Sequence, residues 1–364
     1  MLEREEESVG DVAPVDLRSD TVTRPTGRML EAMASARVGD DFYGEDPTVL
    51  ALEERAAELA GTEDALFVVS GTMANLVAIL ALVPRGRELI AEADTDLVRW
   101  ESHSVAGLAG VQLTAVHGTD GMFGAADLEE LLARDDWRAP QTGMVAVENT
   151  HSAGGGSVWS LDRLEEVASA CRAAGVPLHC DGARLFNAAV AGGYAAHEVG
   201  ALCDTVTFSL YKGLGAPMGS LLCCGAEVRT AAARARRQLG CTFRQIGTMA
   251  AAGLVALEGI EHLAEDHELA HRLARGLRDV LPEWAAPALP STNIVTLRLG
   301  PRAAPFVAAL RERGVLVTEV VPGVVRFVTH RDVDSAGVEL AVAAAARVAP
   351  ETLAAPLATA GERA

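Results

Sequence analysis

Short apolar runs of strand length alternate along this chain with longer segments of helical periodicity. The runs lie at 65–69, 111–117, 143–148, 177–181, 205–210 and 219–224, and helices are predicted between them at 73–82, 125–134, 161–174 and 226–239. Continuous apolar runs are typical of strands buried on both faces, and helical connections let neighbouring strands run parallel. The pattern predicts an α/β fold with a mostly parallel central sheet that is covered by helices on both faces.

A chain of 364 residues is too long for one comfortable core, so we expect a large domain and a smaller one. We place an N-terminal arm and the large domain at 15–255, and a small C-terminal α/β domain at 256–350. The expected elements of the second part are a helical stretch at about 245–280, strands near 293–299, 315–320 and 324–328, and helices at 305–313 and 333–348. The acidic segment 1–14 is expected to be disordered, and 351–364 is expected to form a loose tail.

Charge and hydropathy argue against two classes of partner. The chain has 31 basic and 50 acidic residues, and the resulting net charge of −19 disfavours nucleic acid and anionic membrane surfaces. The longest apolar stretch, 73–83, is too short to cross a bilayer, and we recognise no secretory leader. The six cysteines show no regular spacing and are expected to be reduced, so we expect a cytoplasmic protein.

Lysine is almost absent from the chain. There are thirty arginines and one lysine, Lys212, which lies in the apolar, glycine-rich segment 209–217. Arginine supplies positive charge but keeps its proton, whereas lysine can lose a proton and attack a carbonyl group. A surviving surface lysine is the alternative, but the surrounding sequence favours a lysine with a chemical role.

Two further predicted strands end in residues suited to ligand binding. Ser70-Gly71-Thr72 joins a strand to a helix, and the free N–H groups of a helix N-terminus form a seat for an anion such as phosphate. Asp181 closes the strand 177–181, where a buried carboxylate needs a cation or a proton donor beside it. Serine and threonine also cap helices for purely structural reasons, so the first signal alone is weak.

An anion seat, an acidic strand end and a buried lysine together indicate pyridoxal phosphate. The phosphate would lie at the helix N-terminus, Asp181 would keep the pyridine nitrogen protonated, and Lys212 would form the Schiff base. A metal site is disfavoured because His179, Cys180 and Asp181 are consecutive strand residues whose side chains alternate between faces. A dinucleotide site is disfavoured because no G-x-G-x-x-G sequence follows the first strand.

Seven motifs resemble those of the low-specificity L-threonine aldolase family, within the aromatic amino acid beta-eliminating lyase/threonine aldolase superfamily. The resemblance runs from about 15 to 335, and its motifs are 16–25, 41–48, 70–75, 148–151, 181–185, 212–217 and 326–330. It implies fold type I of the PLP-dependent transferases, which is the aspartate-aminotransferase-like architecture. It also implies active sites shared between the subunits of a homodimer or a homotetramer.

The resemblance assigns roles to individual residues. It implies that Lys212 binds the cofactor covalently, that Asp181 pairs with the pyridine nitrogen, and that Gly71 and Thr72 bind the phosphate together with Arg244 from the same or a neighbouring subunit. Ser19, Arg184 and Arg326 would hold the substrate carboxylate, to which an arginine fork can donate two hydrogen bonds. Tyr43 would contribute to the site of the other subunit across the dimer interface, and His151 would act as a base, or hold a water molecule, near the substrate hydroxyl. Surface ion pairs for the arginines and a loop role for His151 are the alternatives.

One position departs from the family pattern. Members of the family place a histidine over the cofactor ring, and the corresponding residue here is Asp96. A carboxylate cannot stack on a pyridine ring, so either Trp100 or His103 covers the ring through a shifted loop, or the site has changed. The asparagine that follows Thr-His in the family is Ser152 here.

The expected activity is that of a PLP-dependent lyase that cleaves a β-hydroxy-α-amino acid of the threonine or allo-threonine type to glycine and an aldehyde. A related reaction on the same scaffold is the first alternative: β-elimination, transaldolation or racemisation in a specialised pathway. A non-catalytic binding protein is the second alternative, and the presence of Lys212 and Asp181 argues against it.

Overall fold

The computed structural model describes residues 14–285 and 288–353. The tails that we expected at 1–14 and 351–364 therefore lie almost entirely outside the described residues. At the C-terminal end, helix α14 (Ser335–Thr352) continues through Pro350 into the segment expected to be a tail.

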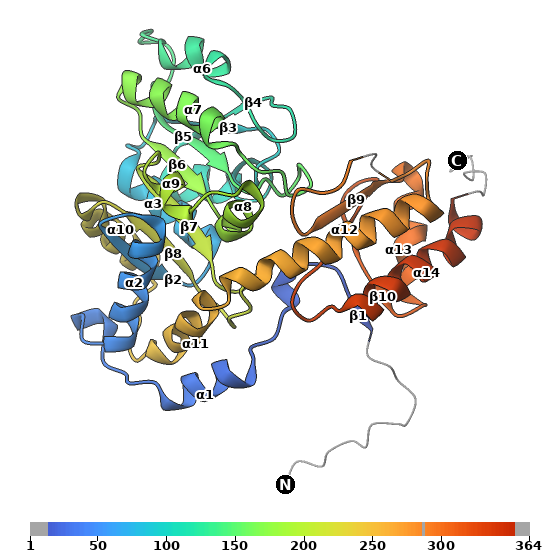
Figure 1. The fold of residues 1–364 in the computed structure, drawn as a ribbon. Coiled ribbons are helices and arrows are strands. Elements are labelled where there is room, and N and C mark those ends of the chain that lie inside the picture. The colour runs from blue at the N-terminus through green and yellow to red at the C-terminus, as the bar shows by residue number, and fades with distance from the viewer. Residues whose placement is uncertain (1–13, 286–287, 354–364) are drawn as a thin grey trace, which may run out of the picture.

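A seven-stranded sheet forms the centre of the large domain (Figure 1). In spatial order its strands are β2 (Asp64–Val68), β8 (Ser220–Cys224), β7 (Thr205–Ser209), β6 (Leu178–Asp181), β5 (Thr142–Glu148), β3 (Glu88–Glu92) and β4 (Gln112–Val116). Strand β8 is antiparallel to both of its neighbours, and the remaining pairs are parallel. The expected mostly parallel sheet is confirmed.

Helices cover both faces of this sheet because both faces of its strands are apolar. Along β2, Leu66 and Val68 pack with α3 (Gly71–Leu82) and α10 (Ala226–Gln238), while Ala65 and Phe67 belong to the core cluster on the opposite face. The helices contributing to that second cluster include α2 (Pro47–Ala60), α7 (Leu161–Ala174), α8 (Leu185–Gly192), α9 (Ala196–Gly200) and α11 (Gly247–Leu257). Helices α1 (Gly27–Ser35) and α6 (Ala125–Leu132) complete the outer layer, α1 against α11 and α6 against α7.

The small domain has a separate core. Its antiparallel sheet has the order β11 (Thr318–Val321), β12 (Val324–Val328), β9 (Ile294–Arg298), and α12 (Leu263–Val280), α13 (Ala303–Arg311) and α14 pack beside it. Figure 1 shows α12 reaching from the large domain to the small one. The single helical stretch expected at about 245–280 is broken between α11 and α12, because the chain makes a short 3-10 turn at Ile260–His262.

The N-terminal arm crosses to the small domain, although we had grouped it with the large one. Strand β1 (Val15–Asp16) pairs in parallel with β10 (Val315–Leu316). Leu17 is completely buried in the small-domain core, and its carbonyl oxygen accepts a hydrogen bond from the Val328 N–H at 2.9 Å. This contact joins residues about 300 positions apart, so local sequence periodicity could not reveal it.

Candidate active site

Several polar residues lie at the carboxyl edge of the central sheet, where open α/β sheets bind their ligands. Glu148 closes β5, Asp181 closes β6 and Lys212 follows β7, and these three strands are parallel neighbours. Helix α3 begins at Gly71, directly after β2. The topology therefore gathers at one edge the residues that the sequence distributes over more than a hundred positions.

Lys212 lines a cavity of about 450 Å³ between the two domains. Ser19 from the arm, Arg184 from the loop after β6 and Arg326 from β12 line the same cavity. The structure thus brings together the expected cofactor lysine and all three residues expected to hold the substrate carboxylate. Asp96 also lines this cavity.

Asp181 is a buried carboxylate without a cation in contact. Its Oδ2 accepts a hydrogen bond from the Asn75 Nδ2 at 2.7 Å, and its Oδ1 accepts one from the Ala183 N–H at 3.1 Å. Burial raises the pKa of Asp181, and the charge of Asp96 raises it further. A protonated ring nitrogen is the kind of donor that such a carboxylate lacks.

Asn75 was not predicted as a site residue from the sequence, yet its side chain connects Asp181 to two further buried polar residues. Its Nδ2 also donates to the Glu101 Oε2 at 3.1 Å, and its Oδ1 lies 3.1 Å from the His179 Nε2. His179 Nδ1 lies 2.8 Å from the Thr205 hydroxyl, so both ring nitrogens are occupied. Within the described residues no group of three His, Cys, Asp or Glu side chains is placed to hold a metal ion.

The start of α3 has the features of an anion seat. The Ser70 Oγ caps the helix by accepting a hydrogen bond from the Met73 N–H at 3.2 Å, and the Gly71 N–H donates to the Tyr211 hydroxyl at 3.2 Å. A Cβ at Gly71 would lie 3.2 Å from the Ser209 Oγ. Glycine therefore leaves free the space beside the Ser209 and Tyr211 hydroxyl groups. Thr72 is exposed beside it.

Arg184 is held by a partner that the sequence did not reveal. Its Nε and Nη2 donate to the two carboxylate oxygens of Asp20 at 2.6 and 2.7 Å, and both side chains are buried. Burial alone would raise the pKa of Asp20, but the Arg184 guanidinium outweighs burial and lowers that pKa. Asn293 Nδ2 donates to the same carboxylate at 3.2 Å. One edge of the Arg184 fork is therefore fixed, which orients the rest of the guanidinium in the cavity wall.

Arg326 has unused hydrogen-bonding capacity. Its Nη1 donates to the Ser152 Oγ at 3.3 Å, whereas its buried Nε has no hydrogen-bond partner among the described residues. Burial lowers the pKa of Arg326, and the nearby charge of Arg184 lowers it further. A bound carboxylate would satisfy this donor and balance the charge.

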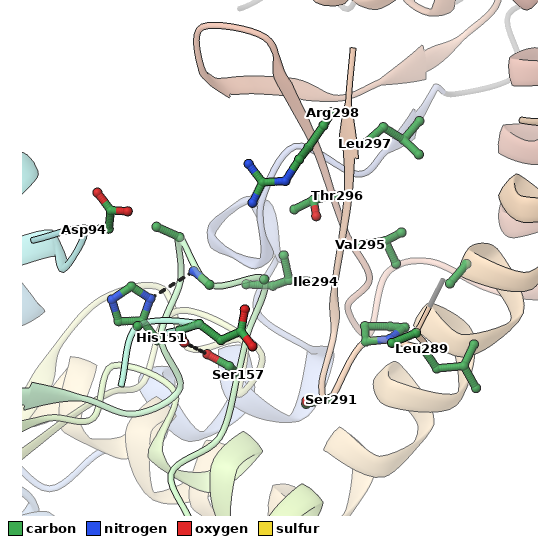
Figure 2. A pocket seen from close by; sticks show the side chains of 18 of the residues that line it. Asp94, His151, Ser157, Leu289, Ser291, Ile294, Val295, Thr296, Leu297 and Arg298 are labelled. Carbon is green, nitrogen blue, oxygen red and sulfur yellow. Dashed lines mark hydrogen bonds between the residues drawn. The ribbon is translucent and has the colours of Figure 1, made fainter. Parts of the chain in front are cut away.

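The structure does not bring His151 into the Lys212 cavity. His151 is completely buried, its Nδ1 accepts a hydrogen bond from the Gly154 N–H at 2.9 Å, and its Nε2 lies 3.2 Å from the Glu92 Oε2. It lines a second cavity of about 460 Å³ (Figure 2). Burial lowers the pKa of His151, whereas the charge of Glu92 acts in the opposite direction and raises it.

Arg244 and Tyr43 also lie outside the Lys212 cavity. The Arg244 Nη1 lies 3.1 Å from the Asp40 Oδ2, and its guanidinium lies over the Phe42 ring at 5.0 Å from the centroid. Tyr43 is 69% exposed. Of the two residues proposed from the sequence to cover a ring, Trp100 lines the cavity and His103 does not.

The residues present fit pyridoxal phosphate. The fit rests on the buried Asp181 carboxylate and on the glycine cradle at the start of α3, which do not themselves line the cavity, and on Lys212, which follows β7, a strand that lies between β2 and β6 in the sheet. Arg326, with its unpartnered Nε, provides a place for the carboxylate of an amino acid. Within the described residues, no helix is long and apolar enough to cross a membrane.

Comparison with known proteins places these features in a family. Residues 16–299 match the family model described as beta-eliminating lyase. The low specificity L-threonine aldolase of Escherichia coli strain K12 is 40% identical over 322 residues, which cover 88% of this chain and 94% of that protein. A probable low-specificity L-threonine aldolase 2 of Arabidopsis thaliana is 38% identical over 338 residues, covering 90% and 95% of the two chains.

A solved threonine aldolase of Leishmania major has the same fold, with a TM-score of 0.80 and 20% identity over 92% of this chain and 99% of that one. The fold type I architecture implied by the sequence motifs is thereby confirmed. The chain belongs to the beta-eliminating lyase family and, within it, to the low-specificity L-threonine aldolases.

Proposed function

We propose that this protein is a PLP-dependent aldolase that cleaves β-hydroxy-α-amino acids of the threonine type to glycine and an aldehyde. The observation that carries the proposal is the position of Lys212. The only lysine of the chain lines a cavity together with Arg184 and Arg326, next to the buried carboxylate of Asp181. This arrangement has a place for the cofactor and a place for an amino-acid carboxylate.

Each residue has a distinct task in this proposal. Pyridoxal phosphate, when bound, supplies an electron sink for the pair left at Cα when the Cα–Cβ bond breaks. Lys212 would hold the cofactor, Asp181 would accept a hydrogen bond from its ring nitrogen, and Gly71 and Thr72 would receive its phosphate. Arg184, Arg326 and Ser19 would bind the substrate carboxylate and so fix the direction of the scissile bond. Such positioning contributes several kcal/mol to catalysis.

The purified holoenzyme should release glycine from L-threonine, L-allo-threonine or phenylserine. Lys212→Ala and the charge-matched Lys212→Arg should both abolish glycine release and the visible absorbance of the bound cofactor, because arginine keeps the charge but cannot lose its proton. Borohydride reduction followed by peptide mass mapping should find the pyridoxyl group on Lys212. Absence of glycine from all three substrates, or a tag on another residue, would contradict the proposal.

We also propose a homodimer or homotetramer in which Tyr43 and Arg244 serve the site of a neighbouring subunit. The support is that both residues lie outside their own Lys212 cavity, with Tyr43 and Phe42 exposed. A cytoplasmic location is proposed as well, supported by six free thiols. Sedimentation of the holoenzyme should give twice or four times the monomer mass.

A further inference from the structure

Cleavage of a β-hydroxy amino acid requires a group that takes the proton of the β-hydroxyl, and this inference rests on the proposed function. His151, the base implied by the sequence motifs, lies on the wall of a different cavity. Figure 2 shows a dashed hydrogen bond at its ring, and its Nδ1 accepts a hydrogen bond from the Gly154 N–H at 2.9 Å. His151 does not line the Lys212 cavity, and its buried Nε2, 3.2 Å from the Glu92 Oε2, has no hydrogen-bond partner among the described residues.

Three carboxylates line the Lys212 cavity: Asp94, Asp96 and Glu319. Asp94 Oδ1 accepts hydrogen bonds from the Arg99 Nε and Nη2, and Glu319 Oε1 accepts one from the Gly323 N–H at 2.7 Å. The Asp96 carboxylate has no hydrogen-bond donor among the described residues. A proton acceptor must have a lone pair available to the substrate, so Asp96 is the best placed of the three.

A backbone hydrogen bond fixes Asp96 beside the end of β5. Its N–H donates to the Glu148 Oε2 at 2.6 Å, which ties the start of α4 (Asp96–Arg99) to the end of β5. Asp181 closes the neighbouring strand β6 in register with Glu148. Asp96 is therefore held beside the strand ends that carry the expected cofactor site.

The charges around Asp96 come from several elements. Groups within electrostatic range of Asp96 lie at the ends of β5 and β6, in the segment after α4, in the loops after β5 and β6, and on β12; these residues are Glu148, Asp181, Glu101, His151, Arg184 and Arg326. Lys212, at the end of β7, lines the same cavity, and Arg99 lies on the same short helix. Burial and the charge of Asp96 both raise the pKa of Glu148.

We propose that Asp96 is the catalytic base of the cleavage step. An oxygen of its carboxylate takes the proton of the substrate β-hydroxyl, and the C–O bond becomes the carbonyl group of the aldehyde. The Cα–Cβ bond breaks, and its electron pair stays with the glycine fragment. Cα then takes up a proton and Asp96 releases one, so the reaction is neutral in protons and electrons.

Two reactions of the same holoenzyme separate this role from a structural one. Cleavage of L-threonine needs a base at the β-hydroxyl, whereas exchange of the glycine α-hydrogen with D₂O has no hydroxyl proton to remove. Asp96→Asn should slow cleavage by about a hundredfold or more, the usual range for loss of a general base, and should change glycine exchange by less than about threefold.

Asp94→Asn is the matched control because it removes one carboxylate from the same cavity wall but one already paired with Arg99. The rates of both reactions should stay close to those of the wild type. If Asp96→Asn fails to bind the cofactor, Asp96→Ala decides the question, because added formate should restore cleavage in proportion to its concentration.

Three results would overturn the proposal: cleavage at the wild-type rate in Asp96→Asn, parallel loss of cleavage and glycine exchange, or no rescue of Asp96→Ala by formate. A failure of the proposed function would look different. The wild-type holoenzyme would then exchange the glycine α-hydrogen yet release no glycine from any of the three β-hydroxy amino acids.

Discussion

Asp266 illustrates how burial controls the charge of a single side chain. It lies in α12 with 3% exposure, and burial, followed by the charge of Asp20, raises its pKa to about 7. In an unfolded chain the pKa of aspartate is near 4, so the folded state binds the proton more tightly between these values. Stability should consequently fall as the pH rises from about 4 to about 7, and should then level off.

Asp266→Asn should remove this dependence. The free energy of unfolding of the variant should exceed that of the wild type by about 4 kcal/mol at pH 8, with the difference disappearing below about pH 4. Urea unfolding of the wild type and the variant at several pH values measures the difference in free energy of unfolding and its pH dependence. Asp279→Asn removes the same charge at an exposed position of the same helix and should have no effect, so an equal gain in that variant would refute the argument.

Individual site residues differ in how far the sequence reveals them. Lys212 and Asp181 could be predicted because each follows an apolar run whose end must lie at the sheet edge. Asp20 could not, because its partner Arg184 is 164 positions away and only the folded chain brings them together. The surroundings of His151 could not be predicted for a related reason: its Nδ1 accepts a hydrogen bond from Gly154 within the same loop, and no periodicity encodes that turn.

At the scale of elements, one carboxylate joins the beginnings of two helices. The Asp46 Oδ1 accepts hydrogen bonds from the Thr48 and Val49 N–H groups of α2, and its Oδ2 accepts one from the Gly247 N–H of α11. Asp46 is 1% exposed, and its charge faces the positive ends of both helix dipoles. It therefore acts as a cap for α2 and as a tie between α2 and α11.

Asp46→Ala should cost about 3 kcal/mol of the free energy of unfolding, because three hydrogen bonds to a buried charge are lost. The comparison is Asp334→Ala, which removes an ordinary cap of α14 and should cost about 1 kcal/mol. Chemical denaturation of both variants gives the two values. Equal losses would mean that the bond to Gly247 contributes nothing.

Helices with clear end signals were predicted closely, and elements without them were not. Helix α7 has the expected bounds, since Ser160 caps its start and Gly175 takes the left-handed conformation after its end. Strand β3 was not expected, because glutamates occupy both of its ends. In the folded protein Glu88 accepts hydrogen bonds from Thr114 and Thr142, which makes its burial tolerable.

For the whole molecule, the ion pair of Asp20 and Arg184 holds three parts together. Asp20 belongs to the arm, Arg184 to the large domain, and Asn293, which donates to the same carboxylate, to the small domain. Removing one partner of a buried pair leaves the other charge unpaired, which is costlier than the loss of a surface pair.

Asp20→Asn should lower the free energy of unfolding by about 3 kcal/mol and should raise the KM for threonine, because Arg184 loses its orientation. Asp16→Asn breaks the half-exposed pair with Arg18 and should cost less than about 1 kcal/mol without affecting KM. Denaturation and steady-state kinetics on both variants test this. A KM unchanged by Asp20→Asn would show that Arg184 does not bind the substrate carboxylate.

The pairing of β1 with β10 has a consequence for biosynthesis. Val15 leaves the ribosome some 300 residues before its partner Val315. The arm that carries Ser19 and Asp20 therefore stays unpaired until β10 has been made. A nascent chain that has completed its large domain consequently still lacks a finished catalytic pocket, so reactivity should begin only after the last strands emerge.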